Sequence, residues 1–395
     1  ECVSIRVNHS RPAYFCQKNR PANDWGIWYN FYMKNIKKVL IAMSGGVDSS
    51  VAAALLKRQG YEVIGATMKL WQENSAETAE SAGPERSCCT LSAVEDARRV
   101  AQMLDIPHYV LNFQAAFSRD VIDYFTQEYL AGRTPNPCIA CNRHLKFGAL
   151  MQRARELDAD FVATGHYAQI HHDPQTDLFQ LLKGLDAKKD QSYVLYHLDQ
   201  HTLAHFLLPL GGFTKTETRA LAAEFGFLVA NKPESQEICF IPDNDYRRFL
   251  QERVPGLIKP GNYVAKDGTV LGVHKGFACY TVGQRKGLGI ALGQPMFVTS
   301  VDPVNNRVVL GPESEVFNDY LSARDVNWIA GTAPTAPLQT MAKIRSTASE
   351  QPAVLIPLAE RRIEIRFTQK QRAITPGQSV VFYEGNSVLG GGIIE

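Results

Sequence analysis

The hydrophobic residues form short unbroken runs in the first half of the chain and alternating stretches in its last third. The run at residues 39–43 is aliphatic and ends near a glycine pair, which predicts a parallel strand covered on both faces. Runs at 61–68, 108–111 and 161–165 predict further strands. Apolar positions at helical spacing lie between these runs. Strands that alternate with helices predict an α/β fold, an open, doubly wound parallel sheet.

The expected helices cover residues 50–56, 92–104, 115–131 and 143–157. Gly60 follows the first of them, where a left-handed residue is expected to end the helix. In doubly wound sheets, ligands bind beyond the carboxyl ends of the strands. The residues that follow the predicted strands are therefore candidates for one common site.

Beyond Gly211 the pattern changes. A capping box at 214–217 opens an amphipathic helix, and a shorter helix is expected over 245–253. Strands then dominate, with hairpins expected over 263–273 and 296–310. The alternating tail is predicted to form a small antiparallel β-barrel.

The composition narrows the class of protein. At 395 residues the chain is expected to hold two or three domains. A formal net charge of +2 argues against a globally basic nucleic-acid-binding protein, although it leaves room for a local basic patch. Eight cysteines are too few for a disulfide scaffold and are better explained by chemistry. Since no apolar run reaches the length of a membrane span, a soluble protein without a membrane partner is expected.

Residues 1–32 fit none of these patterns, because their aromatic residues and prolines show neither helical nor alternating period. Met33 precedes the first predicted strand and would be a natural start. We therefore interpret residues 1–32 as a leader, either a transit segment or translated upstream sequence. The expected location is the cytoplasm, or an organelle if the leader is a transit peptide.

The first candidate chemistry lies at residues 44–49, Ser-Gly-Gly-Val-Asp-Ser. Glycines between a strand and a helix let an anion approach backbone N–H groups, and the helix dipole favours negative charge. The turn has no lysine, so it differs from the loop of enzymes that transfer a terminal phosphoryl group. It resembles the pyrophosphate loop of the N-type ATP pyrophosphatases, with Asp48 expected near Mg²⁺. The alternative is a plain strand-to-helix turn. The residues predicted to contact ATP are Ala42, Met43, Ser44, Gly45, Gly46, Val47, Asp48, Ser49, Met68 and Gly165.

The cysteines offer a second candidate chemistry. Cys138 and Cys141 lie in a segment with two prolines, for which we predict a loop. This pair could be a redox pair, half of a zinc site, or neither. Cys239 lies in another proline-bounded segment, where a thiol is either a nucleophile or a small buried hydrophobe.

From Met33 to the end, the chain resembles the tRNA-specific 2-thiouridylases, the MnmA family. The resemblance rests on seven ordered motifs, which include the glycine turn and all three of these cysteines. The motifs lie at residues 42–49, 131–142, 164–168, 189–193, 235–240, 280–289 and 388–392.

The resemblance implies an N-type ATP pyrophosphatase domain at residues 33–208, a small central α+β domain at 209–277, and a C-terminal antiparallel β-barrel at 278–395 that helps to clasp tRNA. It also implies sulfur transfer to C2 of the wobble uridine: ATP adenylates the C2 oxygen, pyrophosphate leaves, and sulfur displaces AMP. Cys239 matches the residue that carries the sulfur as a persulfide. Cys141 matches the thiol that closes a disulfide with it, and both thiols are expected on mobile loops.

The ligands and partners implied by the resemblance are ATP, Mg²⁺, the tRNAs for lysine, glutamate and glutamine, and a persulfide donor such as a cysteine desulfurase or a relay protein. The target uridine is expected to be flipped out of its stack. The residues expected around the target base are Asn136, Pro137 and Cys138. The residues expected to contact tRNA are His166, Lys189, Asp190, Gln191, Arg345, Ser346 and Gln378.

Alternatives remain for several of these residues. His166 could be a satisfied histidine at a strand end, and residues 188–190 a solvated charge run. Cys138 stands where some family members have an aspartate that is a proposed proton carrier. It could replace that aspartate, line the base pocket or act in redox exchange. Cys138, Cys141 and Cys239 could also hold an iron–sulfur cluster.

Two other functions compete with sulfur transfer. An amide-forming ligase of the NAD or GMP synthetase type shares the glycine turn, but it would have no use for Cys141 and Cys239. A non-catalytic RNA-binding protein would tolerate the loss of Asp48, which this sequence retains.

Overall fold

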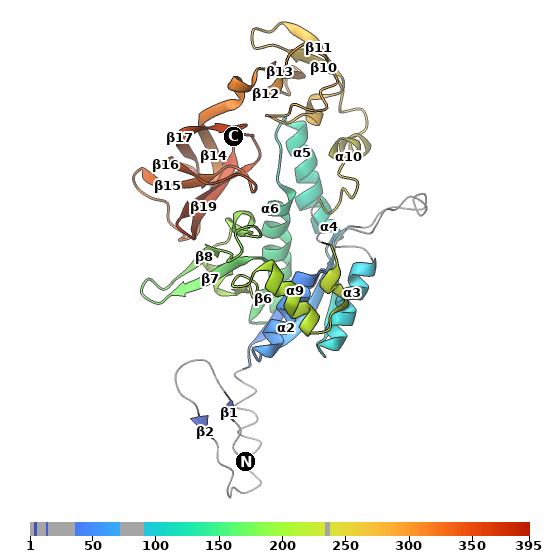
Figure 1. Cartoon of the computed structure of the whole chain (residues 1–395), viewed down its shortest axis with the longest axis vertical. Coiled ribbons are helices and arrows are strands. Elements are labelled where there is room, and N and C mark those ends of the chain that lie inside the picture. Colours follow the sequence, from blue (N-terminus) through green and yellow to red (C-terminus); the bar gives the residue numbers. More distant parts are fainter. Residues whose placement is uncertain (1–3, 6–12, 15–35, 72–90, 234–237) are drawn as a thin grey trace, which may run out of the picture. The chain divides into compact units, whose positions relative to one another are not determined.

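The computed structural model forms two units, Glu1–Lys37 and Lys38–Glu395 (Figure 1). In the first unit, β1 (Ser4–Ile5) pairs antiparallel with β2 (Ala13–Tyr14). Most of residues 1–32 lie outside the described residues, so their interpretation as a leader stays a prediction. The residues that the structure describes are 4–5, 13–14, 36–71, 91–233 and 238–395.

A five-stranded parallel sheet organises the first part of the second unit, with the strand order β5-β4-β3-β6-β9. The strand order reverses between β3 and β6, because the chain adds strands first on one side of β3 and then on the other. Such a reversal is the point at which doubly wound folds bind ligands. The predicted parallel sheet is confirmed, and β9 is the strand that the sequence pattern missed. The strands are β3 (Lys38–Ala42), β4 (Glu62–Lys69), β5 (His108–Asn112), β6 (Phe161–Ala163) and β9 (Phe206–Leu207).

Helices cover both faces of this sheet, as alternate residues of β3 show. Val39 and Ile41 pack in the core beneath one set of helices, whereas Leu40 packs in the core on the opposite face. The helices on the face of Val39 and Ile41 are α2 (Val47–Arg58), α3 (Leu91–Met103) and α9 (Lys215–Glu224). Those on the face of Leu40 are α4 (Gln114–Phe117), α5 (Tyr124–Leu130), α6 (Pro137–Cys141) and α7 (Leu150–Glu156).

Two pairs of these helices are continuous through π-helical segments. Ser118–Asp123 joins α4 to α5, which confirms the helix predicted over 115–131. Asn142–Ala149 joins α6 to α7, so this helix begins at Pro137 instead of the predicted Arg143. Among the described residues, the remaining α-helices are α8 (Gln200–Ala204) and α10 (Tyr246–Arg253), and short 3₁₀ turns cover Ser192–Leu195, Leu228–Asn231, Phe277–Cys279 and Glu313–Val316.

The predicted helix caps are confirmed. Gly60, which follows α2, has a φ of +89°. At α9, the Thr214 side chain accepts a hydrogen bond from Glu217 N, and the Glu217 carboxylate accepts one from Thr214 N. Gly226 after α9 has a φ of +72°, a left-handed conformation that glycine adopts without a steric cost.

A four-stranded sheet with the order β11-β10-β13-β12 follows α10. Both predicted hairpins are present, β10–β11 and β12–β13. The second hairpin was expected within the barrel, but β13 instead pairs in parallel with β10, where Tyr263 lies opposite Val308. Both residues belong to the separate core of this sheet. The strands are β10 (Gly261–Val264), β11 (Val270–His274), β12 (Phe297–Asp302) and β13 (Arg307–Gly311).

The last fifth of the chain forms an antiparallel ring of strands in the order β14-β17-β16-β15-β18-β19, which the pairing of β14 with β19 closes. The predicted C-terminal barrel is therefore confirmed. A hairpin of β7 (Ala168–Asp173) and β8 (Leu178–Lys183), absent from the sequence prediction, extends from β19. Across the described ranges, no helix is both long and apolar enough to span a bilayer. The ring strands are β14 (Phe317–Trp328), β15 (Leu338–Lys343), β16 (Gln351–Pro357), β17 (Ile363–Arg372), β18 (Ser379–Glu384) and β19 (Ser387–Ile394).

Candidate active site

The glycine turn between β3 and α2 lies at the switch point of the sheet. Gly45 has a φ of +68°, and a Cβ there would lie 2.1 Å from the carbonyl oxygen of Ala93, so only glycine fits. The N-cap of α2 is Gly46, which has no side chain to satisfy the first N–H groups of the helix. Ser49 braces the turn, because its Oγ accepts a hydrogen bond of 3.1 Å from Ser44 N. The turn therefore has the backbone features of an anion site.

Gly165, at the end of β6, packs directly against the start of α2. A Cβ on Gly165 would lie 2.8 Å from the carbonyl carbon of Asp48 and 2.9 Å from Ser49 N. Met68 lies near the end of β4, half-buried against the core on the face of Leu40. The structure thus places Gly165 beside the glycine turn, and their contact with ATP stays a prediction.

The Asp48 carboxylate is held by two side chains that the sequence analysis did not identify as site residues. Tyr167 donates its hydroxyl proton to Asp48 Oδ1 at 2.7 Å. Lys215 Nζ donates to both carboxylate oxygens, at 2.7 and 2.8 Å. Lys232 lies at the same turn, 3.3 Å from the Gly45 carbonyl oxygen. No local spacing links these residues to Asp48, because Tyr167 and Lys215 follow it by 119 and 167 positions.

The Asp48 carboxylate could hold a magnesium ion that is bound mainly through substrate phosphates. Within residues 36–71, 91–233 and 238–395, no three His, Cys, Asp or Glu side chains gather as a metal-binding group. Among the described residues, no group of ligands supports the iron–sulfur cluster considered for Cys138, Cys141 and Cys239. The cluster stays a prediction.

The loop predicted around Cys138 and Cys141 is wrong, because both residues lie in helix α6. Pro137 occupies the first helical position, where its missing N–H group is not needed and its fixed φ suits the helix. Asn136 caps this helix, since its Oδ1 accepts hydrogen bonds from Cys138 N at 3.1 Å and Ile139 N at 3.4 Å. Cys138 is exposed and Cys141 is half-buried. Both thiols lie in the first turns of the helix.

Gln378 binds the segment before this helix, and its predicted contact with tRNA stays a prediction. Its Nε2 donates to the Thr134 carbonyl oxygen at 2.9 Å and to that of Pro135 at 3.3 Å. In the same contact, Thr134 N donates to the Pro376 carbonyl oxygen at 2.8 Å. The barrel is thereby attached to the chain just ahead of the two cysteines.

Cys239 lies in a turn, half-buried against the same core as Cys141. The next residue, Phe240, anchors this turn, because its ring packs edge-on against Phe117 and Phe125 at centroid distances of 5.7 and 5.3 Å. Residues 235–237 of the cysteine motif lie outside the described residues.

His166 is 7% exposed. A hydrogen bond of 2.7 Å joins its Nδ1 to Thr164 Oγ1, and Lys146 Nζ lies 3.4 Å from its Nε2. Burial, and then the charge of Lys146, hold the pKa of His166 well below its usual value, so the ring is neutral. These contacts fit the alternative of a satisfied strand-end histidine, and a tRNA contact by His166 stays a prediction.

The other predicted tRNA contacts divide between a loop and the barrel. Asp190 accepts hydrogen bonds from Gly184 N and from the Ser192 side chain, and Gln191 Oε1 accepts one from Tyr167 N at 3.0 Å. These two side chains therefore organise the loop after β8. Lys189 and Arg345 are half-buried, with the pKa of Arg345 lowered by burial and then by Arg372, and Ser346 is exposed. The contacts of all five residues with tRNA stay predictions.

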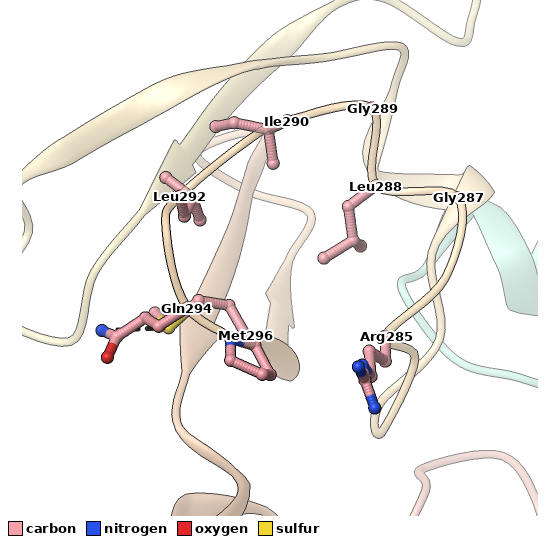
Figure 2. A pocket seen from close by; sticks show the side chains of 9 residues that line it. Arg285, Gly287, Leu288, Gly289, Ile290, Leu292, Gln294 and Met296 are labelled. Atoms are coloured by element: carbon pink, nitrogen blue, oxygen red, sulfur yellow. Dashed lines mark hydrogen bonds between the residues drawn. The ribbon is translucent and has the colours of Figure 1, made fainter.

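A separate hollow of about 280 Å³ lies in the four-stranded part of the molecule (Figure 2). The glycine-rich loop over residues 285–296 lines it, with Arg285 on one side and Gln294 and Met296 on the other. Its lining residues differ from those predicted to bind ATP, tRNA or sulfur.

Three family models match consecutive parts of the chain. A tRNA methyl transferase HUP domain matches residues 37–243, a tRNA methyl transferase PRC-barrel domain matches 247–312, and an aminomethyltransferase β-barrel domain matches 318–394. The domain boundaries expected after residues 208 and 277 stay predictions.

Relatives match along nearly the whole chain. The tRNA-specific 2-thiouridylase MnmA of Clostridium perfringens is 55% identical over 359 residues, which are 91% of this chain and 98% of that protein. Those of Acetivibrio thermocellus and Symbiobacterium thermophilum are each 54% identical over 91% of this chain, covering 99% and 92% of their own lengths. A solved 4-thiouridine synthetase–RNA complex with bound ATP is 20% identical over 56% of this chain and 51% of that chain, with a TM-score of 0.35. The identities to the relatives confirm the resemblance noted in the sequence, and the chain belongs to the tRNA-specific 2-thiouridylase (MnmA) family.

Proposed function

We propose that this protein is an ATP-dependent tRNA sulfurtransferase that forms 2-thiouridine at the wobble position. The observation that carries the proposal is a combination found on one chain of this family. An anion-binding turn with Asp48 lies at the switch point of the sheet, and two cysteines pack against a core of the same sheet. An amide-forming ligase would need the turn but neither Cys141 nor Cys239.

In the first proposed step, ATP activates the uracil. A bond forms between the C2 oxygen and the α-phosphorus, while the bond from that phosphorus to the bridging oxygen breaks and pyrophosphate leaves with the electron pair. The N3 proton of the uracil passes to water. The first N–H groups of α2 would bind the phosphates. Asp48 would hold Mg²⁺ together with phosphate oxygens, and the ion would supply positive charge to the departing pyrophosphate.

In the second proposed step, sulfur replaces the activated oxygen. Cys239 carries a persulfide, whose outer sulfur attacks C2 and expels AMP. The Cys141 thiolate then attacks Cys239 Sγ, so that a disulfide forms between the two cysteines and the outer sulfur stays on the base. A thiol reductant must then reopen the disulfide, and a persulfide donor, a cysteine desulfurase or a relay protein, must reload Cys239.

The target uridine must leave its stack to reach these groups. We propose that it enters beside Asn136, Pro137 and Cys138, since Cys138 is exposed in the first turn of α6. Lysine, glutamate and glutamine tRNAs are the proposed substrates. Contacts to phosphates would make their binding depend on salt concentration.

The test is mass spectrometry of nucleosides from unmodified tRNA incubated with the protein, ATP, Mg²⁺ and a persulfide donor. We expect 2-thiouridine with the unaltered protein and none with Cys141→Ala or Cys239→Ala. Cys279→Ala is the matched control, because Cys279 is a buried cysteine in the core of the four-stranded sheet and should leave activity intact.

The reaction products separate the competing functions. Formation of AMP and pyrophosphate without 2-thiouridine would retain the adenylating turn and reject the tRNA-thiolation assignment. Thiolation that persists in Cys141→Ala would reject the two-thiol mechanism while retaining the reaction. If neither ATP cleavage nor thiolation occurs although tRNA binds, the non-catalytic alternative is favoured.

A further inference from the structure

Lys215 is a buried cation at the glycine turn, and the reaction described above gives it no role. It is 8% exposed, and a lysine is rarely buried unless its charge is paired. Its Nζ donates to both Asp48 oxygens and lies 5.7 Å from the centre of the Tyr167 ring. The ammonium group therefore stands beside the N-terminus of α2, where the phosphates of ATP are proposed to bind.

The backbone of Lys215 is fixed from two directions. Lys215 is the first residue of α9, directly after the capping residue Thr214, whose N–H is bound by Glu217 Oε2 at 2.7 Å. Its own N–H donates to Asp186 Oδ2 at 3.0 Å. Residues of α9 also share a core with residues of α2. Rigid elements thus hold the ammonium group at the turn. A group that binds a ligand with precise geometry requires such support.

Stability alone explains this ion pair poorly. The cost of removing both charges from water offsets much of their attraction, and an apolar pair could fill the same space. The Asp48 side chain also remains 33% exposed, so solvent weakens the pair further. A positive charge at this place does, however, match the negative charge of a triphosphate.

The positive charge of Lys215 matters because of the sequence of the glycine turn. Glycine loops that bind nucleotide phosphates commonly carry a lysine that reaches the β- and γ-phosphates. Residues 44–49 contain none. The fold instead brings Lys215 to the turn from 167 positions further along the chain than Asp48.

We propose that Lys215 is the phosphate-binding lysine of this site, contacting the β- and γ-phosphates of ATP and stabilising pyrophosphate as it leaves. This inference rests on the proposed ATP-dependent function. When the bond from the α-phosphorus to the bridging oxygen breaks, the electron pair stays on pyrophosphate. The ammonium of Lys215 keeps its proton and faces the charge that develops there, while Asp48 orients it.

The test is calorimetric titration of the full chain, without tRNA, with ATP in the presence of Mg²⁺, with pyrophosphate and with AMP. In Lys215→Met, we expect the dissociation constants of ATP and pyrophosphate to rise about tenfold or more, since charge-assisted hydrogen bonds are lost. The dissociation constant of AMP should change less than about twofold, because AMP lacks the phosphates that Lys215 contacts. Lys266→Met is the matched control, because Lys266 is exposed in the turn between β10 and β11 and should leave all three constants unchanged.

Two further comparisons separate contact from folding. Lys215→Arg keeps the charge and should recover part of the affinity for pyrophosphate. If AMP binding in Lys215→Met weakens as much as ATP binding, Lys215 only maintains the shape of the site and the inference is overturned. Unchanged binding of ATP and pyrophosphate would also overturn it, and would leave the proposed function intact. If the unaltered protein binds neither ATP nor pyrophosphate, both the proposed function and this inference fail.

Discussion

Replacing Asn136 with alanine is expected to loosen the helical turn that carries Cys138 and Cys141. Asn136 is the N-cap of α6, and its Oδ1 accepts the two hydrogen bonds that begin this helix, at 3.1 and 3.4 Å. Loss of such a cap costs about 1 kcal/mol. Because the cap lies at a helix end, we expect its loss to lower the free energy of local opening of the first turn instead of that of global unfolding. A change of about 1 kcal/mol raises the open fraction of the turn about fivefold.

Alkylation with iodoacetamide, followed by peptide mass spectrometry, measures this opening. Cys141 is the reporter, because it is half-buried, whereas Cys138 is already exposed. We expect Cys141 in Asn136→Ala to react about fivefold faster than in the unaltered protein. Asn136→Ser keeps a capping acceptor and should restore the slower rate. Cys239 is the internal control. Equal rates at Cys141 in both proteins, or an equal increase at Cys239, would refute the local role of the cap.

Two further substitutions test other contacts. Gln378→Ala removes the hydrogen bonds to the carbonyl groups of residues 134–135. Urea titration should then show a loss of roughly 1 kcal/mol in the free energy of unfolding. An unchanged free energy would mean that these bonds do not form in solution. His197 has both ring nitrogens buried without a hydrogen-bond partner among the described residues, although the residue keeps a partly exposed edge. Burial first, and then Arg143, lower the pKa of His197 from 6.5 to about 3. The unfolded chain therefore takes up a proton before the folded protein does, and stability should fall as the pH falls from about 6.5 toward 3, by at most about 1.4 kcal/mol per pH unit. His197→Phe should flatten this slope in urea titrations, and an unaltered slope would contradict the assignment.

The elements that the sequence predicted are those dictated by neighbouring residues. The apolar run of β3, the glycine pair and the start of α2 are contiguous, and each has a local physical reason for its conformation. The same holds for the capping box that opens α9, where Thr214 and Glu217 satisfy each other's backbone N–H groups. Alternating and turn residues likewise predicted that the end of the chain forms an antiparallel barrel.

The missed elements depend on partners that are distant in the sequence. Strand β7 contains two exposed histidines and lacks an apolar alternation, and it is defined by its pairing with β8. Helix α6 was missed because Pro137 was interpreted as a helix breaker, although a proline is favoured at the first helical position. The contacts of Tyr167 and Lys215 with Asp48 appear only after the sheet and α9 are folded. The roles proposed for Cys141 and Cys239 came from the family resemblance, since their spacing alone left several chemistries open.

The loop at residues 184–191 connects predicted tRNA contacts to the proposed ATP site. Gln191 Oε1 accepts a hydrogen bond from Tyr167 N, and the Tyr167 hydroxyl donates to Asp48. From the same loop, Asp186 binds the N–H of Lys215, whose ammonium binds Asp48. The Asp48 carboxylate is therefore oriented by two groups that this loop itself positions. A contact between RNA and the loop would act on the hydrogen-bonded unit that is proposed to face the phosphates of ATP. Because these groups share partners, the effects of substitutions at Gln191 and Asp48 should not simply add.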